Sequence, residues 1–305
     1  MRLDIEALRV LDIIIQQGSF AKAAEKLCKA QSAVSYQIKK LEQQLGFDIF
    51  DRSHYRAELT PKGQVLWSEG RRMLELASRI ETLAERYSEG WEPSFELVID
   101  GSLPMEPVMR ALKTLVDKDI PTKTQVKVEA LGGVQMRFEH DHSDLMLVKD
   151  YHPAPNLKAI PLPPITFILV ASPEHPLATQ QQISLDQLYD HVELTIQDTS
   201  ENKNQKLDAL QFGGDRVFYM HGFTGKKTAL LMGLGFGWMP TFMIDDELTN
   251  KTLIELNYVG GSQATFTPQL VFDTGRPLGK AGQMVTDLIL DEFQTFDLAS
   301  SNKRQ

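Results

Sequence analysis

The sequence predicts an all-α N-terminal winged helix-turn-helix domain, a long linker helix and a C-terminal α/β part built of two lobes. Three short helical patterns and an extended hairpin fill residues 1–60, and an unbroken helical pattern runs from 61 to 88. After residue 94, strand-like runs alternate with helical ones. The expected boundaries are therefore 1–60, 61–92 and 93–305.

The helix-turn-helix is predicted from two short helices joined by a tight turn. A first helix over 4–17 ends at Gly18, and Ser19 then provides the N-cap of a helix over 20–27. A third helix over 31–45 carries an apolar stripe of Val34, Ile38, Leu41 and Leu45. Its polar leading edge is typical of a helix that enters the major groove of DNA.

A wing and the start of a long helix come next. Two short extended pieces, 48–51 and 56–59, flank a turn and indicate a hairpin. Thr60 fits an N-cap and Pro61 a first helical residue. The wing is therefore expected to lead directly into the linker helix.

Within the long helix, apolar and small residues recur at alternating steps of four and three. A 3.5-residue period indicates a seam for a second helix, and its small residues permit close approach. The seam predicts dimerisation, although the pattern also fits an amphipathic helix lying on its own domain. The seam residues are Leu66, Gly70, Met73, Ala77, Ile80, Ala84 and Tyr87.

Two rhythms of alternating strands and helices make up the α/β part. They predict mostly parallel sheets covered by helices. The proline-rich stretch 161–165 and Thr267-Pro268 interrupt the rhythm, so lobe I is expected to comprise 93–163 and 268–305, and lobe II 164–267. Two lobes joined by two crossings predict a cleft between them.

The net charge is unfavourable for DNA binding over the whole chain but not in its first part. The chain has 32 basic and 41 acidic residues, a net charge of −9. Residues 1–90 hold 14 basic and 13 acidic residues, whereas the rest hold 18 and 28. Five lysines lie within 22–40 beside a single acid, Glu25, and phosphate binding needs only such a local positive face.

Residues 6–63 closely resemble the DNA-binding domain of LysR-type transcriptional regulators. The segments GSFAKAAEKL, QSAVSYQIKKLEQQLG, DIFDR and LTPKG stand in the order and register of that family. Fainter matches follow in SDLMLVK, FILVASPEHPLA and MGLGFGWMP, so the resemblance extends over nearly the whole chain.

The resemblance implies that the α/β part is a two-lobed, periplasmic-binding-protein-like effector domain. It also implies a cytoplasmic homodimer or homotetramer that binds a palindromic operator in double-stranded DNA. A small-molecule effector in the inter-lobe cleft is expected to change DNA binding, bending or assembly. Neither enzyme activity nor a cofactor, metal or membrane partner is expected, and the chain has no apolar run of membrane-spanning length.

The resemblance assigns base or phosphate contacts to the leading edge of the third helix. Ala30 stands where the family usually has Ser, and Ser32 where it often has Pro, so the helix start is expected to differ. Lysines one turn later and the wing are further candidates for phosphate or minor-groove contact, with a solvated lysine as the alternative. The candidates are Gln31, Ser32, Ser35, Tyr36, Lys39, Lys40, Arg52, His54 and Arg56.

In the effector domain, ligand candidates gather where helices begin at the carboxyl ends of strands, because helix N-termini attract anions there. Ser102 and Thr224 each precede a predicted helix, and each also fits a simple helix cap. Lys226 and Lys227 favour an anion, whereas nearby acids oppose one. The candidates are Ser102, Gly133, Gln135, Ile196, Gln197, His221 and Thr224.

Other functions are weighed against a metabolite-responsive regulator. A small-molecule enzyme or binding protein with a DNA-binding head is the weakest, because no nucleophile motif is present. The segment 140–142, His-Asp-His, fits a solvated loop better than a metal site. A redox-responsive regulator acting through methionine or Cys28 is the other alternative, although a small packing role is favoured for Cys28.

Overall fold

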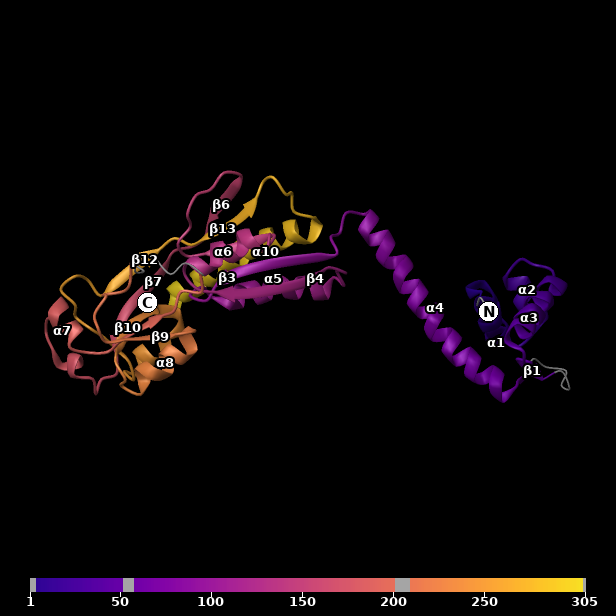
Figure 1. The fold of residues 1–305 in the computed structure, drawn as a ribbon, viewed down its shortest axis with the longest axis horizontal. Helices are drawn as coiled ribbons and strands as arrows, with labels where there is room; N and C mark the ends of the chain where they lie inside the picture. Colours follow the sequence, from indigo (N-terminus) through magenta and orange to yellow (C-terminus); the bar gives the residue numbers. More distant parts are fainter. Residues whose placement is uncertain (1–3, 52–57, 201–208, 304–305) are drawn as a thin grey trace. The chain divides into compact units, whose positions relative to one another are not determined.

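A computed structural model describes residues 4–51, 58–200 and 209–303 of the chain. The chain divides into two compact units, 1–89 and 90–305 (Figure 1). The first is helical with a small hairpin, and the second is built on two β-sheets. The predicted fold class is therefore confirmed.

The first unit follows the order that its capping residues predict. Gly18 ends the first helix with a φ of 71°, and the Ser19 side chain accepts a hydrogen bond from the Lys22 amide. Thr60 caps the long helix in the same way, whereas Ala30 provides no side-chain cap. The elements are α1 (Ile5–Gln17), α2 (Phe20–Lys26), α3 (Gln31–Leu45), β1 (Phe50–Asp51), β2 (Glu58–Leu59) and α4 (Pro61–Ser88).

A buried carboxylate joins α3 to the wing. Glu42 is only 5% exposed, and its Oε1 accepts hydrogen bonds from the amides of Ile49 at 2.9 Å and Phe50 at 3.3 Å. Leu11, Ile14 and other apolar residues of α1–α3 close the core around it. The sequence pattern did not reveal this link, because Glu42 occupies the same helix stripe as buried leucines.

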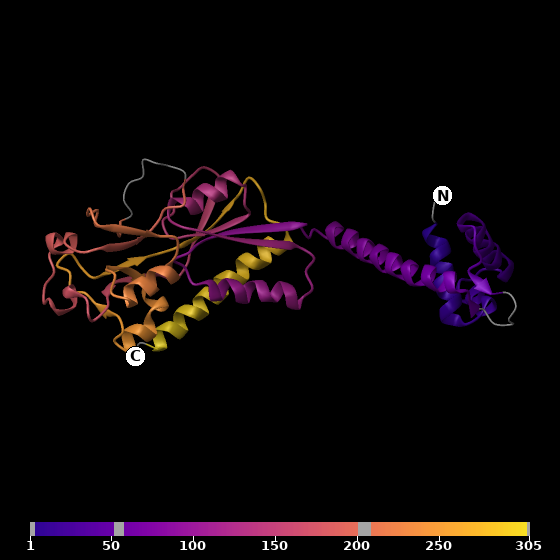
Figure 2. The same cartoon turned by 60° about the horizontal axis from the view of Figure 1, so that its bottom comes forward.

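The first sheet of the second unit forms lobe I. Its order is β4-β3-β5-β13-β6, and β3 runs parallel to β4 and β5 whereas β13 runs antiparallel to β5 and β6. Helices α5 and α10 pack together on one face, and α6 covers the other (Figure 2). The bounds are β3 (Ser94–Asp100), α5 (Met105–Asp117), β4 (Lys123–Glu129), α6 (Gly132–His140), β5 (Leu145–Val148), β6 (Leu157–Pro161), β13 (Gln269–Asp273) and α10 (Lys280–Lys303).

The second sheet forms lobe II. Its order is β11-β7-β10-β8-β9, with β12 also paired to β7. The strand β8 is parallel to β9 and β10, whereas β7 is antiparallel to β10, β11 and β12. The bounds are β7 (Ile165–Ala171), α7 (Leu185–Tyr189), β8 (Glu193–Ile196), β9 (Val217–Met220), α8 (Phe223–Leu231), β10 (Phe236–Pro240), α9 (Asp245–Thr249), β11 (Ile254–Glu255) and β12 (Gln263–Phe266), with 3₁₀ turns at Pro176–Thr179 and Thr241–Met243.

The prediction of mostly parallel sheets is wrong, because both sheets are mixed. The chain leaves lobe I between β6 and β7 and returns between β12 and β13, so outgoing and returning strands run in opposite directions. A buried apolar strand has the same sequence pattern in either direction, and pattern alone does not distinguish them.

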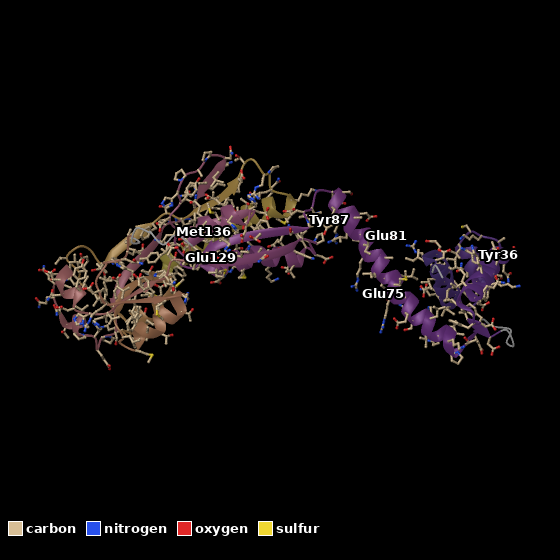
Figure 3. All side chains as sticks on the ribbon, viewed as in Figure 1. Tyr36, Glu75, Glu81, Tyr87, Glu129 and Met136 are labelled. Atoms are coloured by element: carbon tan, nitrogen blue, oxygen red, sulfur yellow. The ribbon has the colours of Figure 1, made fainter. Side chains whose placement is uncertain are left out.

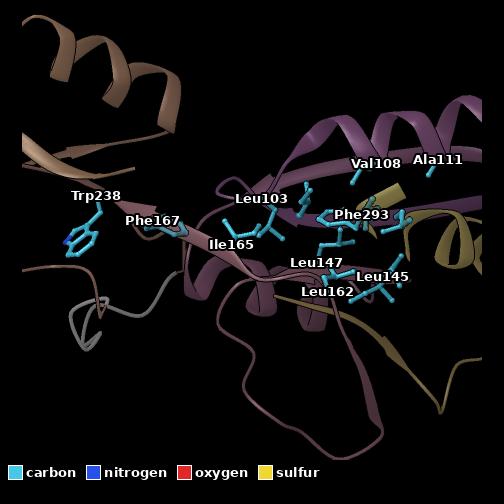
Figure 4. Packing of buried hydrophobic residues seen from close by; sticks show 14 of the residues in the cluster. Leu103, Val108, Ala111, Leu145, Leu147, Leu162, Ile165, Phe167, Trp238 and Phe293 are labelled. Atoms are coloured by element: carbon cyan, nitrogen blue, oxygen red, sulfur yellow. The ribbon is translucent and has the colours of Figure 1, made fainter. Parts of the chain in front are cut away.

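One apolar core runs through both lobes (Figure 4). Val108 and Phe293 lie at the lobe I end, and Trp238 lies at the lobe II end. Ile165 and Phe167, at the start of β7, connect the two. Since the crossing strands are themselves part of this core, the region between the lobes is packed with side chains except where a pocket remains.

Candidate functional site

The outer face of α3 is polar and exposed. Val34, Ile38 and Leu41 are buried beneath it, and Tyr36, the largest exposed side chain of this face, is 69% exposed (Figure 3). Because the apolar stripe anchors the helix in the core, its opposite face is open to solvent. The predicted residues that share this exposed face are Gln31, Ser32, Ser35, Tyr36, Lys39 and Lys40.

The remaining predictions for the first unit concern the wing and the turn between α2 and α3. Arg52, His54 and Arg56 lie outside the described residues. Cys28 is exposed and has a φ of 51°, in the turn between α2 and α3. The favoured packing role for Cys28 is therefore wrong, because its side chain lies on the surface rather than in the core.

The predicted seam of α4 divides between two environments. Leu66 packs against the core of its own unit, and Gly70 lies against the side chain of Leu8. Further along, Met73, Ile80 and Tyr87 are 41%, 59% and 37% exposed, and Ala77 is half-buried. The first part of the seam thus serves intradomain packing, and the later part is open.

Leu76 belongs to the open part, although the strict four-three spacing missed it. Leu76 is 58% exposed and lies one helical turn from Met73 and Ile80. A wider apolar face, as helix-helix contacts often use, would have included it. We call the exposed set Met73, Leu76, Ile80, Ala84 and Tyr87 the α4 stripe.

A small pocket lies between the lobes of the second unit, with an interior volume of about 20 Å³. Polar groups from both lobes reach it, and aromatic and aliphatic side chains fill the remaining wall. We call it the inter-lobe pocket. Its lining is Asp100, Ser102, Ala130, Leu131 and Lys149 from lobe I, and Phe167, Thr195, Ile196, Leu210, Phe223, Lys226 and Trp238 from lobe II.

Asp100 and Ser102 form a buried unit on the lobe I side of the pocket. Both the amide and the hydroxyl of Ser102 donate to Asp100 Oδ1, at 2.8 Å and 2.6 Å. The other oxygen, Oδ2, has no hydrogen-bond partner among the described residues. Burial raises the pKa of Asp100 to about 6, against the lowering effect of the Ser102 hydrogen bonds. Ser102 therefore orients a carboxylate and does not cap α5, whose N-cap is Pro104.

Two buried lysines bring positive charge to the same pocket. The Lys149 ammonium lies 2.5 Å from the Asp150 carboxylate and 4.2 Å from the centre of the Phe266 ring. Lys226 is 3% exposed and lies over the Phe223 ring. Lys149 was not among the predicted residues, although it directly follows the buried strand β5. Ligand-binding residues of α/β sheets often lie in this way at the carboxyl ends of strands, which we call the strand-end rule.

The other predicted effector residues do not converge. Ile196 lines the inter-lobe pocket, but Gln197 and His221 are exposed outside its lining. Gln135 is held by the backbone of His152, to which it donates at 2.8 Å and from which it accepts at 3.0 Å.

Gly133 and Thr224 also lie away from the inter-lobe pocket. Gly133 packs so closely on Thr199 that a side chain there would overlap the Thr199 hydroxyl. Thr224 is the second residue of α8, so it does not precede that helix, whose N-cap is Gly222. It lines a separate cavity of about 770 Å³ at the starts of α5 and α8. The starts of α5 and α8 therefore share this larger cavity, although Ser102 itself lines the inter-lobe pocket instead.

Among residues 4–51, 58–200 and 209–303, no cluster of three His, Cys, Asp or Glu side chains fits a metal ion. Within the same described ranges, no helix combines the length and apolar character needed to cross a membrane.

Replacing Asp100 by Asn is expected to stabilise the effector domain at neutral pH. The Asp100 pKa is about 6 in the folded chain against 3.8 for an ordinary aspartate, which corresponds to about 3 kcal/mol against folding when the carboxyl is ionised. The folded state binds the extra proton, so this cost falls to about half near pH 5 and disappears below about pH 4. Calorimetric unfolding of both proteins across this range checks the prediction. The exposed Asp287→Asn change is the control, and an equal gain at all pH values would contradict the assigned cause.

Two family models match the sequence. Residues 5–64 match the bacterial regulatory helix-turn-helix protein model of the lysR family, and residues 105–294 match the LysR substrate binding domain. The probable HTH-type transcriptional regulator YhaJ of Escherichia coli is 30% identical over 254 residues, which cover 82% of this chain and 85% of YhaJ. The HTH-type transcriptional activator AllS of Klebsiella pneumoniae is 30% identical over 243 residues, or 78% and 89% of the two chains.

Solved structures share the fold. A Corynebacterium glutamicum OxyR C206 mutant aligns with a TM-score of 0.60 at 21% identity, over 99% of this chain and 97% of that one. Full-length LysG from the same organism aligns with a TM-score of 0.51 at 19% identity, over 96% and 99%. At these identities the likeness supports the architecture alone.

Proposed function

This chain belongs to the LysR family of bacterial transcriptional regulators, and we propose that a small molecule held in its inter-lobe pocket controls how it binds a palindromic operator. The supporting observation is that buried polar groups of both lobes line one pocket. A ligand that touches both lobes favours one lobe arrangement and so shifts the equilibrium between arrangements. In this proposal residues 1–60 would bind DNA and residues 61–92 would dimerise. Residues 93–305 would sense the effector, with the lobe boundaries at 163/164 and 267/268. The protein would act in the cytoplasm.

DNA reading is assigned to the exposed face of α3. Gln31 and Ser32 begin the helix, and Ser35 and Tyr36 follow on the same exposed side. A glutamine offers both a donor and an acceptor and matches the major-groove edge of adenine. Lys39 and Lys40 carry positive charge without such geometry, which suits phosphate.

Gln31→Ala is expected to weaken binding to the operator by about 1–3 kcal/mol and leave binding to random DNA nearly unchanged. Lys39→Ala is the matched comparison on the same face. It should weaken binding to both the operator and random DNA and lower the salt dependence of binding. Titrations of both variants against operator and random duplexes at several salt concentrations check this. Equal losses on both duplexes for Gln31→Ala would remove its base-reading role.

Self-association is assigned to the α4 stripe. Its side chains are apolar and exposed over several turns of a helix whose first part packs on α1. Packing against the α4 helix of a second copy would bury the stripes of both helices. The two-fold axis of such a dimer would match the symmetry of a palindromic operator. The supporting feature is the length of the stripe, since scattered single apolar residues are common on surfaces.

Operator complexes formed with and without an effector test the whole proposal. A thermal-shift screen of small molecules first identifies one that stabilises the full-length protein. Footprinting and DNA-bending assays then compare the complex with and without that molecule. A molecule that binds the effector domain without changing either assay would contradict control by the inter-lobe pocket.

A further inference from the structure

The inter-lobe pocket contains two buried polar atoms that lack partners in the described chain. Asp100 Oδ2 belongs to lobe I and Trp238 Nε1 to lobe II, and these residues are 3% and 8% exposed. Buried polar groups are almost always hydrogen-bonded, because leaving one unpaired costs free energy. Because both residues line one pocket, one from each lobe, the two unpaired atoms indicate that a ligand supplies the missing partners.

The chemistry of these atoms defines what the ligand must offer. The indole Nε1–H of Trp238 can only donate, so it needs an acceptor. The buried ammonium groups of Lys149 and Lys226 line the same pocket and also donate. Asp100 Oδ2 needs a donor, because Ser102 already occupies Oδ1. The ligand therefore carries an anionic acceptor group at one point and a hydrogen-bond donor at another.

The charges and the size of the pocket further restrict the chemical class of the ligand. A ligand ammonium as the donor would lie in a pocket that already holds two lysine ammonium groups, and like charges disfavour it. A second carboxylate would face Asp100 with the same penalty. A hydroxyl group donates to Asp100 without adding charge. The interior volume of about 20 Å³ holds little more than one water molecule, so the ligand must be small and must part the lobes slightly.

We infer that the inter-lobe pocket binds a small monocarboxylate that carries a hydroxyl group. Its carboxylate accepts from the Trp238 indole and the lysine ammonium groups, and its hydroxyl donates to Asp100 Oδ2. This inference rests on the proposed function of the pocket as the effector site. It adds the chemical class of the effector and the residue that recognises each of its groups.

The test compares matched compounds on the full-length protein. Glycolate, lactate and the three hydroxybenzoates are set against acetate, propionate and benzoate, with serine, alanine and phenol as further probes. Thermal shift and titration calorimetry measure binding. At least one hydroxy acid is expected to bind about tenfold or more tightly than the same acid without its hydroxyl, since a buried acceptor would otherwise stay unpaired.

Two variants assign the contacts. Trp238→Phe keeps an aromatic side chain but removes the indole N–H donor, and is expected to weaken binding of the hydroxy acid and of its matched acid alike by about tenfold. Asp100→Asn is expected to bring the ratio between the two compounds close to one. His221→Ala, exposed outside the pocket lining, is the matched control and should bind like the parent protein. Cooperative thermal unfolding of each variant establishes that it is folded.

Each outcome separates the inference from the proposed function. If serine, alanine or phenol binds best and Trp238→Phe weakens the binding of that compound, the pocket remains the effector site. The assignment of the effector to the hydroxy acids is then wrong. If a hydroxy acid binds and both pocket variants bind it unchanged, the inference and the pocket assignment both fail. If no hydroxy acid in the panel binds, the class is overturned, and the footprinting assay with any other stabilising molecule still tests the pocket.

Discussion

Ile80→Glu is expected to turn the protein into a monomer and to lower its affinity for a palindromic operator by about a hundredfold or more. Ile80 is 59% exposed and lies in the middle of the α4 stripe. In a two-fold dimer the change would bring two carboxylates into one apolar contact, where unpaired charges are strongly disfavoured. Two linked half-site contacts would then become one, which removes the gain from bivalent binding. Sedimentation velocity and operator titration at one salt concentration measure both effects.

Thr82→Glu is the matched control for this change. Thr82 is exposed two residues from Ile80, on the opposite side of α4, so the same charge enters outside the stripe. It should leave assembly and operator affinity nearly unchanged. A dimer of normal operator affinity in the Ile80→Glu protein would move the interface away from the α4 stripe.

Glu42→Ala is expected to destabilise the helix-turn-helix locally by about 3 kcal/mol. The change removes a buried carboxylate and leaves the amides of Ile49 and Phe50 without the acceptor seen in the structure. Both residues are at most 4% exposed, so water does not replace that acceptor easily. Hydrogen exchange of the α3 and β1 amides in the full-length protein should rise by about a hundredfold. Operator affinity should fall with it, because α3 and the wing lose their link.

Two controls separate the hydrogen bonds from other effects of this change. Glu42→Gln keeps an acceptor oxygen and should show a smaller increase in exchange. Gln43→Ala alters an exposed neighbour in the same helix and should show none. Equal exchange in Glu42→Ala and the parent protein would mean that the buried carboxylate does not hold the wing in solution.

The helix-turn-helix was predictable from sequence because its signals are local. Gly18, Ser19 and Thr60 act on backbone groups within a few residues of themselves, and the structure shows each in its expected role. The stripe of α3 likewise follows from helical spacing, which determines the side that can face DNA. Glu42 is the exception, since its partners belong to the wing and only folding brings them near.

The inter-lobe pocket was not predictable in the same way. Asp100 and Lys149 follow different strands of lobe I, and Lys226 and Trp238 come from a helix and a strand of lobe II. The strand-end rule correctly selects a neighbourhood, but it also selects Thr224, which lies in another cavity. Which of these side chains meet depends on the pairing and direction of strands far apart in the chain.

The sequence by itself determined the order of the elements in residues 1–88, the exposed face of α3 and the membership of the family, because these depend on short-range patterns. Only the tertiary structure decided that the sheets are mixed, that the start of the α4 seam packs on its own unit and that Ser102 orients Asp100. These features depend on contacts between distant segments. The sequence around a residue does not indicate which distant side chain will hydrogen-bond to it or cover it, because such contacts produce no periodic pattern.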